Sequence, residues 1–171
     1  MIPATDSSFA TGGCDCGGVR YSFLAAPIFT HCCHCSWCQR ETGSAFAVNA
    51  MIETNRLEVK GSVPDLVLTP SASGKGQKIA RCPACRVAVW SHYATLDAKL
   101  AFVRVGTLDD PSRCPPDVHI FTSTKQTWVT LPAGAEAYKE FYSAADRARM
   151  FGPERMARRQ ALIDEAKRES C

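Results

Sequence analysis

Short segments with alternating apolar and polar positions dominate the chain up to residue 129. In Val19–Phe23 and Leu57–Lys60 an apolar residue recurs at every second position, which is typical of half-buried strands. Clusters of Gly, Pro, Ser and Asp separate further segments of this kind. These segments predict additional strands at Phe46–Met51, Asp65–Leu68, Val87–Trp90, Leu100–Val105, His119–Phe121 and Thr127–Val129. The body of the protein is therefore predicted to be mainly β.

The pattern changes near the C-terminus, where Pro153–Arg168 is rich in helix-forming residues. Pro suits the first turn of a helix, and the cations Lys167 and Arg168 suit its last turn. We expect the apolar side of this helix to pack against the sheet or against a second copy of the chain, which would make a homo-oligomer. The apolar side consists of Met156, Leu162, Ile163 and Ala166.

Composition limits the class of protein and its partners. A chain of 171 residues with 46% hydrophobic and 22% charged residues suits one globular domain with a real core. The net charge of +3 is too small to indicate nucleic acid, and no apolar run reaches the roughly 18 residues of a membrane span. Because Met1–Ala10 lacks the pattern of a secretory signal, we expect a cytoplasmic protein with reduced thiols.

The ten cysteines carry the strongest chemical signal in the sequence. Cysteines one or two residues apart are badly placed to bridge each other, but they can bind one tetrahedral zinc together. Close spacing therefore favours metal binding over a disulfide framework. The close groups are Cys14-x-Cys16, Cys33-x-Cys35-x-x-Cys38 and Cys82-x-x-Cys85.

Counting ligands divides these groups between two zinc ions per chain. The two pairs at Cys14–Cys16 and Cys82–Cys85 supply the four thiolates of a closed structural site, and the triplet in the short loop Cys33–Cys38 supplies three, which leaves an open position. The alternative is one zinc ribbon made of Cys35–Cys38 and Cys82–Cys85, although their separation far exceeds the usual 15 to about 20 residues. No partner pattern exists for Cys32, Cys114 and Cys171, which are expected to be ordinary buried or terminal thiols.

Two stretches carry a resemblance to a known family. They are Gly12–Tyr21, which reads GGCDCGGVRY, and Cys33–Phe46, which reads CHCSWCQRETGSAF. This order and spacing resemble the glutathione-dependent formaldehyde-activating enzyme family, whose domain is shared with centromere protein V. Later segments agree with it, namely Cys82–Cys85, Val105–Pro111 and His119–Phe121 with Lys125 and Trp128.

The resemblance implies a mainly β fold of the β-tent (Mss4-like) type over residues 12–142, between an N-terminal extension 1–11 and a C-terminal helical extension 143–171. It also implies a structural zinc on Cys14, Cys16, Cys82 and Cys85, and a catalytic zinc on Cys33, Cys35 and Cys38. The implied reaction is the addition of glutathione to formaldehyde, a carbon–sulfur lyase reaction run in reverse. The chain departs from the family at Arg86, where Gly is usual and positive φ is favoured, and at Arg81, where an aromatic residue is usual.

Zinc held by three thiolates carries a net negative charge and suits thiol chemistry better than water activation. A substrate thiol in the open position would lose its proton and attack an aldehyde, and no further catalytic side chain is predicted. Cationic side chains would bind the carboxylates of glutathione, and Arg40 and Lys125 are the candidates. The alternative is a non-catalytic, zinc-stabilised binding module in which a fourth ligand closes the site, and Cys32 is the neighbouring donor that leaves this alternative open.

Three histidines are expected to stay outside the metal chemistry. His34 lies between two ligands, so in an extended loop its ring should point away from the metal. His92 and His119 are expected to be hydrogen-bonded structural residues.

Overall fold

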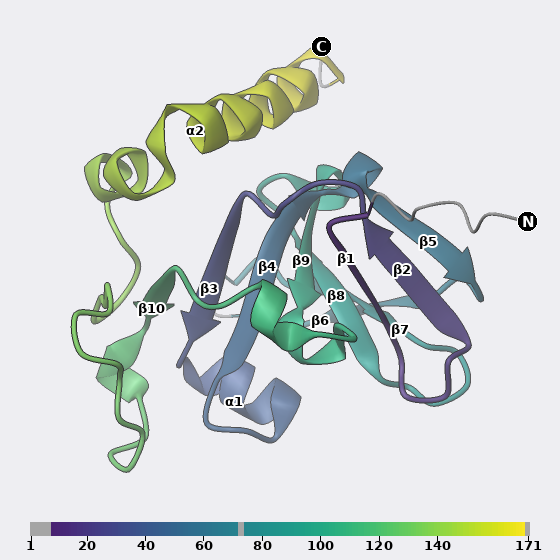
Figure 1. The fold of residues 1–171 in the computed structure, drawn as a ribbon, viewed down its shortest axis with the longest axis horizontal. Coiled ribbons are helices and arrows are strands. Elements are labelled where there is room, and N and C mark those ends of the chain that lie inside the picture. The colour runs from purple at the N-terminus through teal and green to yellow at the C-terminus, as the bar shows by residue number, and fades with distance from the viewer. Residues whose placement is uncertain (1–7, 72–73, 170–171) are drawn as a thin grey trace, which may run out of the picture.

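The computed structural model describes residues 8–71 and 74–169, which form two β-sheets and two α-helices (Figure 1). The smaller sheet is antiparallel and has the strand order β1-β2-β5. Its strands are β1 (Ala10–Gly13), β2 (Val19–Phe23) and β5 (Leu57–Gly61).

The larger sheet has seven strands in the order β10-β3-β4-β9-β8-β7-β6. All neighbouring pairs are antiparallel except β10 and β3, which run parallel at one edge. The strands are β3 (Phe29–Cys33), β4 (Ala47–Glu53), β6 (Asp65–Thr69), β7 (Gln77–Arg81), β8 (Ala88–Tyr93), β9 (Leu100–Arg104) and β10 (Val118–Ile120).

The larger sheet separates two hydrophobic cores. Because side chains alternate across a strand, Ala50 and Ile52 of β4 belong to the core shared with the smaller sheet, whereas Met51 belongs to the core on the other face. Helix α2 (Ala144–Glu169) covers this second core with Phe151 and Leu162. Figure 1 shows α2 and the β1-β2-β5 sheet on different sides of the larger sheet.

Helix α2 is interrupted at Gly152, whose φ of 67° and ψ of 176° are not helical, and its second part begins with Pro153. The apolar side predicted for this part packs within the chain, since Leu162 is buried and Met156, Ile163 and Ala166 contact the second core. Packing of the helix against the sheet is thus confirmed. The short helix α1 (Ser36–Thr42) follows β3 and ends at Gly43, which has a φ of 63°.

The predicted mainly β fold with a C-terminal helix is confirmed, with corrections at individual elements. The strand predicted at Thr127–Val129 is wrong, because this segment is a turn and an irregular connection. The cysteine segment predicted as a loop instead enters helix α1 at Ser36. Three strands had no prediction, namely β1, β3 and β7.

One buried ion pair fastens α2 to the sheet. Arg158 contacts both carboxylate oxygens of Glu53 at 2.8 and 2.6 Å, and the two side chains are only 15% and 6% exposed. Without Arg158, the buried Glu53 carboxylate keeps a longer contact of 3.6 Å with the half-exposed Arg56. Arg158→Leu should therefore lower the free energy of unfolding by about 2 kcal/mol, because two hydrogen bonds to a charged group are lost. Denaturant titration measures this change. The exposed Arg168→Leu control should change stability by less than about 0.5 kcal/mol, and an equally small effect of Arg158→Leu would contradict the role given to the pair.

Within residues 8–71 and 74–169, no helix combines the length and the apolar character needed to cross a membrane. The nine cysteines in these residues form no disulfide. Cys114 is buried in the first core as an ordinary thiol. Burial raises the pKa of Cys114 to about 11. Cys171 lies outside the described residues.

Candidate active site

Two turns that are distant in the sequence bring four cysteines together. Cys14 and Cys16 lie in the β1–β2 turn, and Cys82 and Cys85 lie in the β7–β8 turn. The sulfur atom of Cys16 lies 3.5 Å from the sulfur of Cys14 and 3.7 Å from the sulfur of Cys82. Zinc–sulfur bonds of 2.3 Å in a tetrahedron place the sulfurs about 3.8 Å apart. The spacing and the donor type therefore fit a closed zinc site, and the group could hold this metal.

The β7–β8 turn shows how the chain accommodates its departure from the family pattern. Arg86 has a φ of 61°, as expected for a position where Gly is usual, and its backbone N–H donates to the carbonyl of Cys82 at 3.0 Å. The side chain of Arg81 supports the same turn, because it donates to the carbonyl of Arg86 at 3.3 Å. Arg81 also forms an ion pair with Glu41 of α1. The two departures thus leave the four cysteines converged.

A second group forms where β3 leads into α1. Cys33 ends β3, Cys35 is the N-cap residue of α1, and Cys38 lies in the first helical turn. The Cys35 sulfur accepts a hydrogen bond from the backbone N–H of Cys38 at 3.4 Å. The helix therefore brings Cys38 back toward Cys35 and fixes the spacing that the sequence suggested for a loop. Three soft donors from one short segment could hold a zinc ion.

The hydrogen bonds among the three thiols favour the thiolate form at Cys35. Hydrogen bonds with Cys33 and Cys38 hold the pKa of Cys35 far below its usual value, and the hydrogen bonds with Cys35 and Cys38, together with burial, raise the pKa of Cys33. A hydrogen bond with Cys33 and the Arg104 cation lower the pKa of Cys38, but the Cys35 thiolate and burial outweigh them and raise it to about 11. A bound metal ion would replace the protons that remain on Cys33 and Cys38, because thiols bind metals as thiolates.

A third group lies beside the triad and was not foreseen. Cys32, His34 and His119 bring their donor atoms together, with His34 Nε2 at 3.5 Å from the Cys32 sulfur and at 3.0 Å from His119 Nδ1. Parallel pairing of β10 with β3 places His119 opposite Cys32, and sequence spacing gives no signal for this pairing. His34 therefore does point away from the triad, and burial lowers its pKa to about 4.

The position of Cys32 decides whether the triad is closed. Cys32 belongs to the histidine group, and no fourth cysteine, histidine or carboxylate joins Cys33, Cys35 and Cys38 in the part of the chain that the structure describes. His92, the remaining histidine with a predicted structural role, bonds to the carbonyl of Leu100 at 2.9 Å and accepts from Trp90 at 3.1 Å. With three protein donors, the triad leaves the fourth position of a tetrahedral metal to an external ligand.

The triad lines a cavity of about 390 Å³. Aromatic side chains from five separate segments form much of its wall, namely Trp37, Tyr93, Phe102, Phe121 and Phe141. Asn49 adds a polar group, and its Oδ1 accepts a hydrogen bond from the buried Arg104 at 2.5 Å. A ligand in the cavity would meet the three sulfurs at one end and a largely apolar surface around them.

The two cations predicted to bind substrate are not among the residues that line this cavity. Arg40 is exposed on α1, and the Lys125 ammonium donates to the carbonyls of Gln126 and Val129 at 3.1 and 2.6 Å. The cation that does line the cavity is Lys75, which follows β6 in the chain. No sequence pattern had singled out Lys75 as a site residue.

Comparison with known proteins places the chain in a family. The sequence is similar to a Rhodobacter sphaeroides protein of known crystal structure, with 23% identity over 58% of this chain and 87% of that chain and a TM-score of 0.44. Among curated proteins no significant match was found. The model of the glutathione-dependent formaldehyde-activating enzyme family matches residues 9–124, which contain all seven cysteines of the two groups. The chain belongs to the glutathione-dependent formaldehyde-activating enzyme family.

Proposed function

We propose that the protein catalyses the addition of a thiol, glutathione in the first instance, to formaldehyde at a metal held by Cys33, Cys35 and Cys38. The observation that carries this proposal is the cysteine triad, which faces a cavity and has no fourth protein donor in residues 8–71 and 74–169. A second zinc on Cys14, Cys16, Cys82 and Cys85 would be structural, giving two ions per chain.

The chemistry of the metal accounts for the first requirement of the reaction. When bound, Zn²⁺ supplies a position at which a thiol exists as thiolate near neutral pH. The protein fixes the donors around that position, because Cys35 is the N-cap of α1 and Cys33 ends a fully buried strand. The sulfur of the substrate is thereby presented to the cavity rather than to bulk solvent.

The cavity wall supplies positioning. Arg104 donates to the Oδ1 atom of Asn49 and so fixes the orientation of this amide, whose NH₂ group is the donor that it can offer to the aldehyde oxygen. Burial raises the pKa of Tyr93, so its phenol also remains a hydrogen-bond donor. The aromatic walls limit water around the reacting atoms, and holding both reactants in one geometry lowers the entropic part of the barrier.

The reaction is redox-neutral. A carbon–sulfur bond forms between the thiol sulfur and the aldehyde carbon, and the carbon–oxygen double bond becomes a single bond. The proton lost by the thiol ends on the new hydroxyl oxygen, so thiol and aldehyde give a hydroxymethyl thioether with no further reactant. The protein has to supply only thiolate, proximity and hydrogen-bond donors.

We also predict further substrate contacts, an oligomer and a cellular location for this protein. Contacts of Arg40 and Lys125 with the carboxylates of glutathione would require a substrate that reaches beyond the cavity. A homo-oligomer formed through α2 would have to use a surface other than the apolar side that already packs on the sheet. A cytoplasmic location would keep the seven metal-ligand cysteines reduced.

The rate of adduct formation tests the proposed reaction. Zinc-loaded protein added to glutathione and formaldehyde should accelerate adduct formation above the spontaneous rate, in proportion to protein concentration. A protein that only binds glutathione would change the amount of adduct once, up to its own concentration, without turnover. An unchanged rate would reject glutathione as substrate, and the same result for several cellular thiols would favour the alternative of a non-catalytic binding module.

A further inference from the structure

Two arginines of α2 line a second cavity beside the first. This cavity has a volume of about 190 Å³, and Arg147 and Arg159 contribute to its wall together with His31 and Tyr142. Both arginine side chains are half-buried. The guanidinium of Arg147 also lies over the Tyr142 ring, 5.5 Å from its centre, and the Tyr142 hydroxyl is 2.7 Å from His31 Nε2. The two cations therefore line an otherwise largely apolar hollow.

The break in α2 explains how both arginines reach one small cavity. In a straight helix, residues 147 and 159 would be separated by about 18 Å along the axis. Gly152, with a φ of 67°, ends the first part of α2 between them, and Pro153 starts the second part in another direction. Figure 1 shows this change of direction in α2. The break at Gly152 and Pro153 thus allows Arg147 and Arg159 to line the same cavity.

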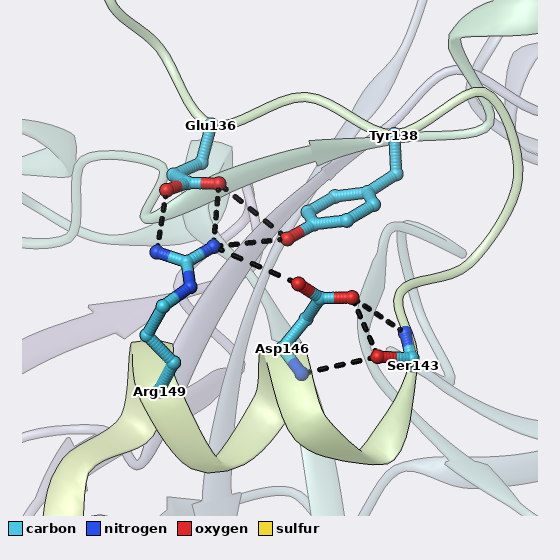
Figure 2. Close-up of polar contacts among 5 residues, drawn as sticks. All are labelled: Glu136, Tyr138, Ser143, Asp146 and Arg149. Atoms are coloured by element: carbon cyan, nitrogen blue, oxygen red, sulfur yellow. Dashed lines mark hydrogen bonds and ion pairs between the residues drawn. The ribbon is translucent and has the colours of Figure 1, made fainter.

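A polar network fixes the first part of α2 and engages the nearby acids. Ser143 caps the helix by accepting from the backbone N–H of Asp146 at 3.1 Å, and its hydroxyl donates to the Asp146 carboxylate at 2.6 Å. Arg149 donates to Glu136 at 2.7 Å and to the Tyr138 hydroxyl at 3.1 Å. Figure 2 shows these contacts. The guanidinium of Arg149 also lies 3.8 Å from the Asp146 carboxylate, so both carboxylates of the network pair with Arg149.

The other acids around α2 are engaged as well. Glu53 pairs with Arg158, Asp117 pairs with Arg155, and Lys99 contacts both Glu165 and Glu169. In the described part of the chain, no ion pair joins an acidic side chain to Arg147 or Arg159. Burial, followed by the charge of Arg147, lowers the pKa of Arg159, which is the effect of two neighbouring cations without a carboxylate between them.

The second cavity adjoins the cavity of the cysteine triad. The two cavities share five lining residues, namely His31, Tyr93, Thr95, Phe102 and Phe141. A molecule whose sulfur lies at Cys33, Cys35 and Cys38 would have to pass these shared residues to reach the arginines. Guanidinium groups present planar pairs of N–H donors that match a carboxylate.

We propose that Arg147 and Arg159 form a subsite that binds a carboxylate of the thiol substrate. This subsite rests on the proposed function for its partner at the triad, and it makes carboxylate-bearing thiols the preferred substrate class. The family model ends at residue 124, so the subsite comes from the C-terminal part of the chain and is a feature beyond the family match. The arginines position the substrate and take no part in bond formation.

Calorimetry on the zinc-loaded full chain tests the subsite without requiring turnover. The two probes are glutathione and its diethyl ester, which keeps the thiol but loses both negative charges. The wild-type protein should bind glutathione more tightly than the ester. Arg147→Gln/Arg159→Gln should raise the Kd for glutathione at least about tenfold, the loss expected when a charged hydrogen-bonded pair is removed. The Kd for the ester should change little.

Two further variants separate the subsite from charge and folding effects. Arg168→Gln removes one cation from the exposed end of the same helix and should leave both Kd values unchanged. Arg147→Lys/Arg159→Lys keeps the charges and should restore part of the preference for glutathione, provided that thermal unfolding shows a folded protein. Equal losses for glutathione and ester, or no loss for either, would overturn the subsite. Selective binding without catalysis would instead reject the proposed reaction and leave the subsite in place.

Discussion

Cys82→Ser is expected to destroy most of the stability of this protein. The Cys82 side chain is fully buried, and its sulfur belongs to the group that joins the β1–β2 turn to the β7–β8 turn across 66 residues of sequence. Metal binding by such a group contributes directly to folding, because the ligands converge only in the folded chain. The loss should be at least about 5 kcal/mol, comparable with the whole stability of many small domains.

Soluble yield and thermal unfolding in the presence of zinc measure the effect of Cys82→Ser. Cys114→Ala is the matched control, since it removes another buried thiol from the same core but touches no cysteine group. The control should lose only about 1 to 2 kcal/mol, as usual for a small core truncation. If Cys82→Ser were no more harmful than the control and kept all its zinc, the four-cysteine group would not be structural.

Cys35→Ser is expected to remove the reaction while keeping the fold. Cys35 is the N-cap of α1, and serine is among the best N-cap residues, so the hydrogen bond to the backbone N–H of Cys38 can be retained. The triad nevertheless loses one of three sulfur donors, and zinc should fall from two ions to one per chain. The rate of adduct formation should fall to the spontaneous background.

The neighbouring Cys32→Ser is the control for this experiment. Cys32 lies one residue from the triad but turns its sulfur toward His34 and His119, so the variant should keep both zinc ions and most of the activity. Metal analysis, unfolding and rate are measured on both variants. Loss of soluble protein in Cys35→Ser to the same extent as in Cys82→Ser would mean that the triad is a second structural site.

The sequence predicted the parts of this molecule that depend on local pattern. Alternation located β2 because Val19, Tyr21 and Phe23 point into the core. It also located β5, although only Leu57 of that strand is buried and Val59 is exposed. Cysteine spacing identified the groups that converge, because short turns hold neighbouring thiols close together wherever they lie in the fold. Strand β3 escaped prediction because all five of its positions are buried although two are polar, Thr30 and His31.

The remaining parts depend on contacts between distant segments. His119 reaches His34 only through the parallel pairing of β10 with β3, and Arg147 approaches Arg159 only because of the break at Gly152. Likewise, no local signal connects Lys75 with a cavity that also contains Asn49. For substrate contacts the sequence therefore offered only the cations Arg40 and Lys125, whereas the cavity wall is assembled from the tertiary fold.

A crystal structure of the zinc-loaded protein with glutathione tests the central claim most directly. The claim predicts a metal bound by Cys33, Cys35 and Cys38, with the glutathione sulfur as its fourth ligand at about 2.3 Å. The rest of the glutathione molecule should lie in the aromatic cavity. A metal whose fourth ligand is a protein side chain, with glutathione elsewhere or absent, would contradict a catalytic triad and would identify the protein as a zinc-stabilised binding module.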